Sequence, residues 1–132
     1  MDFYEAMDNI MDSHDVTVGG GSASAAAAAM AAGLIGMVAR LSVSKNGKTY
    51  GLPDDEYIAC ADRLDRLGAE LKRGASDDAD AYIGLRNAYA MPKETDGQKS
   101  ARRAAIEDAA VAAASVPLKN AKLAASVSEI AA

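Results

Sequence analysis

The sequence predicts an all-α domain, a closely packed helical bundle with alanine- and glycine-rich helices. Half of the 132 residues are hydrophobic, but 31 are alanine, one is phenylalanine and none is tryptophan. Alanine is the best helix former, and a core with few bulky side chains has to bring helix backbones close together. The chain also lacks the alternating apolar and polar runs that indicate strands. At 13.5 kDa it suits one domain over residues 1–132.

The first two predicted helices flank a run of glycines. Residues 2–14 favour a short amphipathic helix. One face of that helix carries Phe3, Met7, Ile10 and His14. The segment Gly19–Gly21 is expected to be a loop, because glycine loses more backbone entropy on ordering than any other residue. Ser22 is expected to be the N-cap of a second helix over residues 22–41, in which Gly33 and Gly36 leave a smooth surface for another backbone.

A connector over residues 44–53, with a turn at 45–48, leads to the third predicted helix. This helix begins near Asp54 or Asp55 and is expected to end or kink at Gly74. Its apolar positions follow a three- and four-residue spacing. They are Tyr57, Cys60, Ala61, Leu64, Leu67 and Leu71.

Three more helices are predicted toward the C-terminus. The segment Ser76–Asp78 is expected to cap the first of them, which stops before Pro92. An alanine-rich helix over residues 99–115 follows a loop at 91–97. Pro117 is expected to open or kink the last helix.

Charge and composition exclude several classes of function. The formal net charge of −5 argues against a nucleic-acid partner, which usually selects a basic face. The one cysteine, Cys60, is interpreted as a core residue, and the one histidine, His14, as a solvated residue at a helix end. No disulfide framework and no metal site is therefore expected. Acidic residues stand where a signal peptide would be basic, and the uncharged segment 23–39 is mostly alanine and glycine. We expect a cytoplasmic protein that does not engage a membrane.

The glycine segment is the first candidate site. Free amides at a helix N-terminus, together with the helix dipole, favour bound carboxylates or phosphates. Neither nucleotide-loop pattern fits, because no Gly-Lys-Ser/Thr follows Gly19 at the P-loop distance and Ser24 stands where a dinucleotide fingerprint needs glycine. A tight turn that leads into a closely packed helix is the alternative interpretation.

Asp77, Asp78 and Asp80 form the second candidate site. Acidic residues in the first turn of a helix complement its dipole, which is one interpretation of this cluster. The other is catalysis, because a carboxylate held near others binds a proton more tightly and can act as an acid or base near neutral pH. With one histidine in the chain, a carboxylate is the best available proton carrier.

Three ordered motifs resemble the family of formiminotetrahydrofolate cyclodeaminases and methenyltetrahydrofolate cyclohydrolases. The first is Thr17–Ser22 (T-V-G-G-G-S), before a small-residue helix that ends M-V-A-R-L. The second is Asp78–Tyr82 (D-A-D-A-Y) with Met91–Lys93 (M-P-K) downstream, and the third is Ser115–Leu118 (S-V-P-L). The resemblance covers essentially the whole chain. Val18 replaces the family's usual proline. The sequence given ends before the C-terminal helices that family members usually carry beyond the third motif, which leaves open a shortened member, a fragment, or a partner chain that supplies the rest.

The resemblance implies an all-helical homodimer with a folate site in a groove near the dimer interface. It implies hydrolysis of 5,10-methenyltetrahydrofolate, or deamination of 5-formiminotetrahydrofolate to it, with the folate as substrate and no cofactor. Asp78 matches the family's catalytic aspartate. Gly19, Gly20, Gly21 and Ser22 are expected to contact the substrate, with the amides of the glycine segment at a carboxylate of its glutamate tail. Lys45, Lys48 and Lys93 are alternative anchors for that carboxylate, and the other interpretation of these lysines is a solvated surface. Two alternatives stay open: a non-catalytic helical dimerisation module derived from this family, and an anion carrier.

Overall fold

The computed structural model describes residues 3–45 and 48–132, and of Phe3 only the backbone. Its helices are α1 (Phe3–Met11), α2 (Gly20–Leu41), α3 (Asp54–Tyr89) and α4 (Asp96–Ala131). The predicted all-α class is confirmed for these residues. The β pairing among them is a single antiparallel bridge between Lys45 and Lys48 in the α2–α3 loop. The centre of the predicted turn, residues 46–47, lies outside the described part of the chain.

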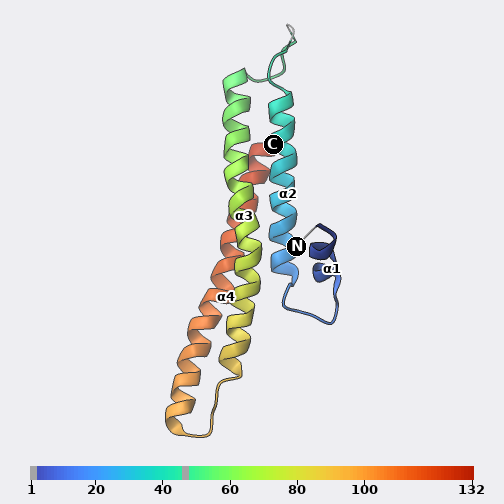
Figure 1. Cartoon of the computed structure of the whole chain (residues 1–132). Coiled ribbons are helices and arrows are strands. Elements are labelled where there is room, and N and C mark those ends of the chain that lie inside the picture. Colours follow the sequence, from blue (N-terminus) through green and yellow to red (C-terminus); the bar gives the residue numbers. More distant parts are fainter. Residues whose placement is uncertain (1–2, 46–47) are drawn as a thin grey trace.

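The two longest helices, α3 and α4, form an antiparallel hairpin, and α2 lies alongside α3 (Figure 1). α2 packs mainly on α3 and touches α4 at fewer points. The hairpin continues past the N-terminus of α2 as a two-helix arm (Figure 1). The short helix α1 lies beside the first half of α2, away from that arm.

The core consists of small residues on α2 that pack against larger ones on α3. A Cβ atom at Gly36 would lie 3.7 Å from the Leu64 Cβ atom, so the two helices approach closely at this level. This agrees with the expectation that alanine and glycine bring backbones together. Gly33, by contrast, faces open space. The buried apolar residues are Ala25, Ala32, Ala39, Ala61, Leu64, Leu71, Ala88 and Val127.

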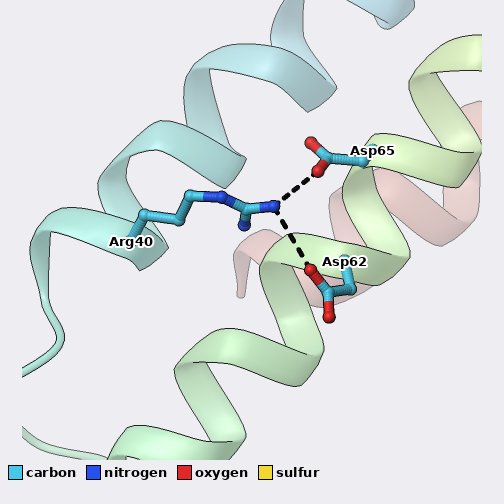
Figure 2. Close-up of polar contacts among 3 residues, drawn as sticks. All are labelled: Arg40, Asp62 and Asp65. Carbon is cyan, nitrogen blue, oxygen red and sulfur yellow. Dashed lines mark hydrogen bonds and ion pairs between the residues drawn. The ribbon is translucent and has the colours of Figure 1, made fainter.

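An ion-pair cluster links the C-terminal end of α2 to α3. The Arg40 Nη2 atom lies 3.2 Å from Asp62 Oδ1 and 2.5 Å from Asp65 Oδ2 (Figure 2). All three side chains are about half exposed, and exposed ion pairs contribute only about 0–1 kcal/mol. The cluster therefore sets the register of α2 against α3 more than it stabilises the fold.

Two predicted helix breaks do not occur. α3 continues through Gly74, and α4 continues through Pro117, so the six predicted segments are four helices within the described residues. Gly74 is buried where α4 crosses α3, and the Asn120 side chain donates a hydrogen bond to its carbonyl oxygen. Packing of long helices against each other outweighs the local cost of glycine and proline. The segment Ser76–Asp78 therefore lies inside α3 and caps nothing.

The predicted N-cap of α2 is also wrong. The cap is Gly19, and α2 begins two residues before Ser22. Gly20 and Gly21 thus form the first turn of α2 and are not a loop. Ser22 is 3 % exposed, and its hydroxyl points to another helix.

The remaining elements differ from expectation in detail. α1 ends at Met11, and the His14 side chain is 96 % exposed beside Asp12, as predicted for a solvated residue. Cys60 is half-buried, so it borders the core and does not lie within it. A capping box in which Thr95 and Gln98 exchange hydrogen bonds begins α4, and the sequence reasoning did not predict it.

By length and composition, α2 is apolar enough to cross a membrane. One face of α2 nevertheless packs on α3, as expected for a core helix. The opposite face is exposed. Its large apolar residues are Met30, Leu34, Met37, Val38 and Leu41.

Candidate active site

The two candidate motifs of the sequence, 56 residues apart, meet in space. The carboxylate of Asp78, in the middle of α3, lies against the first turn of α2, where the Ser22 hydroxyl donates a hydrogen bond to Oδ2 at 3.2 Å. A Cβ atom at Gly21 would lie 2.5 Å from each carboxylate oxygen of Asp78, closer than real Cβ contacts allow. Glycine at position 21 is therefore a requirement of this contact.

The contact explains part of the glycine run. Helix N-termini attract anions through unpaired amides and the helix dipole. The anion that lies against the first turn of α2 is the protein's own carboxylate, that of Asp78. Gly20 differs from Gly21, since nothing lies within 4 Å of a Cβ atom at position 20. Gly20 is thus open toward solvent while Gly21 packs on Asp78.

A pocket of about 240 Å³ lies beside this contact, between the start of α2 and the second half of α4. From α2 it is lined by Gly20, Gly21, Ser24 and Ala25, and from α4 by Pro117, Asn120, Ala121 and Ala124. Pro117 belongs to the third motif of the sequence analysis. The glycine motif, the aspartate motif and the proline motif therefore converge where α2, α3 and α4 meet.

Asn120 is a pocket residue that the sequence reasoning missed. It is 5 % exposed, and its Nδ2 atom donates a hydrogen bond of 3.0 Å to the Gly74 carbonyl oxygen. Its Oδ1 atom accepts no hydrogen bond from the described part of the protein. A buried acceptor without a partner costs about 1–3 kcal/mol. Asn120 lines the pocket, but its Oδ1 atom lies against Gly74 in the contact between α3 and α4. The sequence feature that could have revealed it is the amide side chain itself, three residues after Pro117 in an alanine-rich helix.

Other predicted site residues lie elsewhere. Asp77 and Asp80 are exposed on other faces of α3, so they do not join Asp78 as a carboxylate cluster. Lys45 and Lys48 belong to the loop at the opposite end of α2, a helix of 22 residues and about 33 Å. Lys93 lies in the α3–α4 loop at the tip of the arm. Among the predicted residues, Gly21, Ser22 and Asp78 come together, with Gly20 beside them and Gly19 as the helix cap.

The described residues contain no group of three or more histidine, cysteine or acidic side chains placed to hold a metal ion. That the reaction needs neither metal nor cofactor stays a prediction. The cytoplasmic location stays one as well.

Comparison with known proteins agrees with the motifs. The sequence profile of the formiminotransferase-cyclodeaminase family matches residues 4–132. A curated relative from Methylorubrum extorquens, named methenyltetrahydrofolate cyclohydrolase, is 36% identical over 102 residues, which cover 77% of this chain and 48% of the relative. The chain thus spans about half the length of the curated relative that it matches. Fold, motif positions and both matches lead to one conclusion: the chain belongs to the formiminotransferase-cyclodeaminase family.

Proposed function

We propose that the protein hydrolyses 5,10-methenyltetrahydrofolate, with Asp78 as the acid–base residue. The observation that carries this proposal is the Asp78 carboxylate, held by Ser22 and packed on Gly21, which also lines a pocket together with Pro117 of the third motif. The relative's name, methenyltetrahydrofolate cyclohydrolase, favours hydrolysis over deamination.

The hydrolysis needs one group that both takes and returns a proton. Water adds to the carbon that bridges N5 and N10, and Asp78 accepts one proton from that water. The tetrahedral adduct then collapses: the bond from carbon to N5 breaks, Asp78 returns its proton to N5, and the second water proton leaves to solvent as the formyl C=O forms. A positioned acid–base residue typically contributes ~10²–10⁴-fold. Because Ser22 donates to Oδ2, the other oxygen, Oδ1, keeps its lone pairs for the attacking water.

Deamination of 5-formiminotetrahydrofolate is the second candidate, favoured by the family description. Here N10 attacks the carbon of the protonated formimino group, –CH=NH₂⁺, and gives its own proton to Asp78. Asp78 then protonates the nitrogen that leaves as ammonia, and the methenyl bridge remains. The same carboxylate serves both reactions, so the site geometry supports either one.

We further propose that the protein is a homodimer through the exposed face of α2. Met30, Leu34, Met37 and Leu41 follow a 4-3-4 spacing along that face, as in helices that pack on a partner helix. Gly33 lies among them and faces open space, which permits a close approach. A non-catalytic dimerisation module would use the same surface.

The methenyl chromophore provides the test of the proposed function. Purified protein is mixed with 5,10-methenyltetrahydrofolate, and the decay of its absorbance band is compared with that in buffer alone. Faster decay with protein supports hydrolysis. Appearance of the band from 5-formiminotetrahydrofolate supports deamination. Neither change, in a folded and dimeric protein, would support the non-catalytic module.

A further inference from the structure

A second pocket lies under the short helix α1, between α1, α2 and α3. Its volume is about 580 Å³, within the range of about 300–1,000 Å³ that is usual for small-molecule sites. α1 lies beside the first half of α2 (Figure 1) and contributes Met7 and Ile10, while α2 contributes Met30. None of the residues that line it lines the pocket beside Asp78, so the two sites are separate. We call it the α1 pocket.

The floor of the α1 pocket consists of small residues on α2 and α3. A Cβ atom at Gly68 would lie 3.5 Å from the Ala29 carbonyl oxygen and 3.5 Å from the Ala32 Cβ atom, so the two helix backbones meet there and the core fixes the floor. Ala69 also lines the pocket, and it is exposed. A larger side chain at position 69 would fill part of the pocket without entering the core. Packing of α2 on α3 therefore does not require alanine at this position.

The walls of the α1 pocket are large apolar side chains that still face water. Met7, Ile10 and Met30 are 39 %, 40 % and 55 % exposed. Within the described part of the chain, α1 makes few contacts with the other helices. Removing apolar surface from water is favourable, and methionine adapts its shape to what it contacts. An apolar ligand would thus find an adaptable wall over a rigid floor.

One charged residue, Lys72, lines the α1 pocket, and the other nine described lining residues are apolar. Lys72 lies on α3 between Ala69 and Ala75, which also line the pocket, so its aliphatic stem runs along the same face. Its neighbours one turn away, at positions 68, 69, 75 and 76, are glycine, alanine and serine. Lys72 forms no ion pair within the described residues. The pocket therefore combines an apolar interior with one exposed, unpaired cation.

We propose that the α1 pocket binds a free, unbranched aliphatic carboxylate of medium chain length. Its chain lies between α1 and the floor, and its carboxylate pairs with the ammonium group of Lys72. The apolar chain matches the nine apolar lining residues, and the carboxylate matches the single cation. The acidic residues of α1 do not line the pocket. The proposal does not depend on the proposed function, because it uses no residue of the pocket beside Asp78.

A chain-length series tests the apolar part of the proposal. Hexanoate, octanoate and decanoate are titrated into the full chain below their micelle concentrations, and the side-chain methyl NMR signals of Met7 and Ile10 are followed. Affinity should rise about three- to fourfold with each added methylene, the usual gain for burying one CH₂ group. Absence of methyl shifts with decanoate would overturn the proposal.

A variant that fills the pocket shows whether decanoate binds there. Ala69→Leu should weaken decanoate binding at least about tenfold, because the added side chain occupies the space of the ligand. The melting temperature should stay unchanged, since Ala69 is exposed and leucine is a good helix former. Ala59→Leu is the matched control, since it alters an exposed alanine of α3 that does not line the pocket. Equal decanoate affinity in both folded variants would contradict the assigned site.

The role of the charge is tested at Lys72. Lys72→Met keeps the aliphatic stem and should weaken decanoate about two- to fivefold, as loss of one exposed ion pair would, and leave binding of decanol unchanged. Lys122→Met removes an exposed lysine of α4 outside the pocket and should behave as wild type. Equal affinity of the wild type for decanoate and for the decyltrimethylammonium cation would overturn the proposal, because Lys72 would then not select the ligand. Shifts of Met7 and Ile10 that appear when the protein alone is concentrated would also overturn it, because a second copy would then cover the pocket.

Discussion

The Asp78 carboxylate lies so close to the α-carbon of Gly21 that no side chain fits between them. Gly21→Ala should push the carboxylate away from Ser22, lower turnover and cost about 1–3 kcal/mol of stability, as overpacking does. Gly20→Ala is the matched control, since a Cβ atom there meets nothing within 4 Å and alanine favours a helix. Thermal melting and the methenyl assay measure both effects. Gly21→Ala with the melting temperature and turnover of Gly20→Ala would contradict the contact.

Asp54 offers a test of local electrostatics at the opposite end of α2. Hydrogen bonds from the hydroxyl and the backbone N–H of Ser44 lower the pKa of Asp54 below its ordinary value of 3.8. A lowered folded-state pKa means that this carboxylate stabilises the fold above pH 3.8, and that the contribution is lost as pH falls through the lowered value.

We therefore expect Ser44→Ala to raise the pKa of Asp54 toward its ordinary value, because the hydroxyl is the larger cause of the shift. A carboxyl-carbon NMR titration measures it. Ser42→Ala serves as control, since that hydroxyl donates to the Val38 carbonyl oxygen and to no acid. An unchanged Asp54 titration in Ser44→Ala would show that the hydroxyl does not hold the carboxylate.

Among the helices, sequence reasoning found which segments are helical but not where they are continuous. Gly74 and Pro117 are breakers by local propensity, about 1 and 3 kcal/mol worse than alanine in a helix. In the fold, Gly74 gives room for the Asn120 amide, which would collide with any Cβ atom there. Such a contact joins residues 46 apart, so no local pattern reveals it. For the same reason the start of α2 was predicted wrongly: the Ser22 hydroxyl does not cap its own helix but donates a hydrogen bond to Asp78 on α3.

The two glycines in the middle of α2 allow packing within the protomer and the proposed packing between protomers to be tested separately. Sequence reasoning expects both to pack against another helix. Gly36 contacts Leu64 on α3, whereas Gly33 faces open space. Gly36→Leu should therefore lower stability by about 1–3 kcal/mol through overpacking.

Gly33→Leu should leave the stability of the protomer unchanged and weaken the proposed dimer. Analytical ultracentrifugation across micromolar concentrations, together with thermal melting, distinguishes the two variants. A monomeric wild type would contradict the dimer. Equal melting of Gly36→Leu and wild type would contradict the close contact between α2 and α3.

For the molecule as a whole, the sequence predicted the fold class and named both candidate motifs, but it did not predict that the two motifs meet. Composition alone indicated an all-α bundle over small residues, and the structure confirms it. The glycine motif and Asp78 were separate candidates, with Asp78 expected in a first turn among other acids. The fold instead places a half-buried Asp78 inside α3, against the first turn of α2, and leaves Asp77 and Asp80 exposed. Long-range packing selects one carboxylate of three.

That selection is the basis of the central claim, that Asp78 carries the proton in one-carbon folate chemistry. The most direct test is turnover of 5,10-methenyltetrahydrofolate by Asp78→Asn, with melting temperature measured on the same sample. Asparagine keeps the shape of the side chain, and its amide oxygen can still accept a hydrogen bond from the Ser22 hydroxyl, so the fold should be retained. Turnover should fall at least about a hundredfold, the lower end for loss of an acid–base residue, whereas Asp77→Asn and Asp80→Asn should stay near wild type. Near-normal turnover by a folded Asp78→Asn protein would contradict the claim.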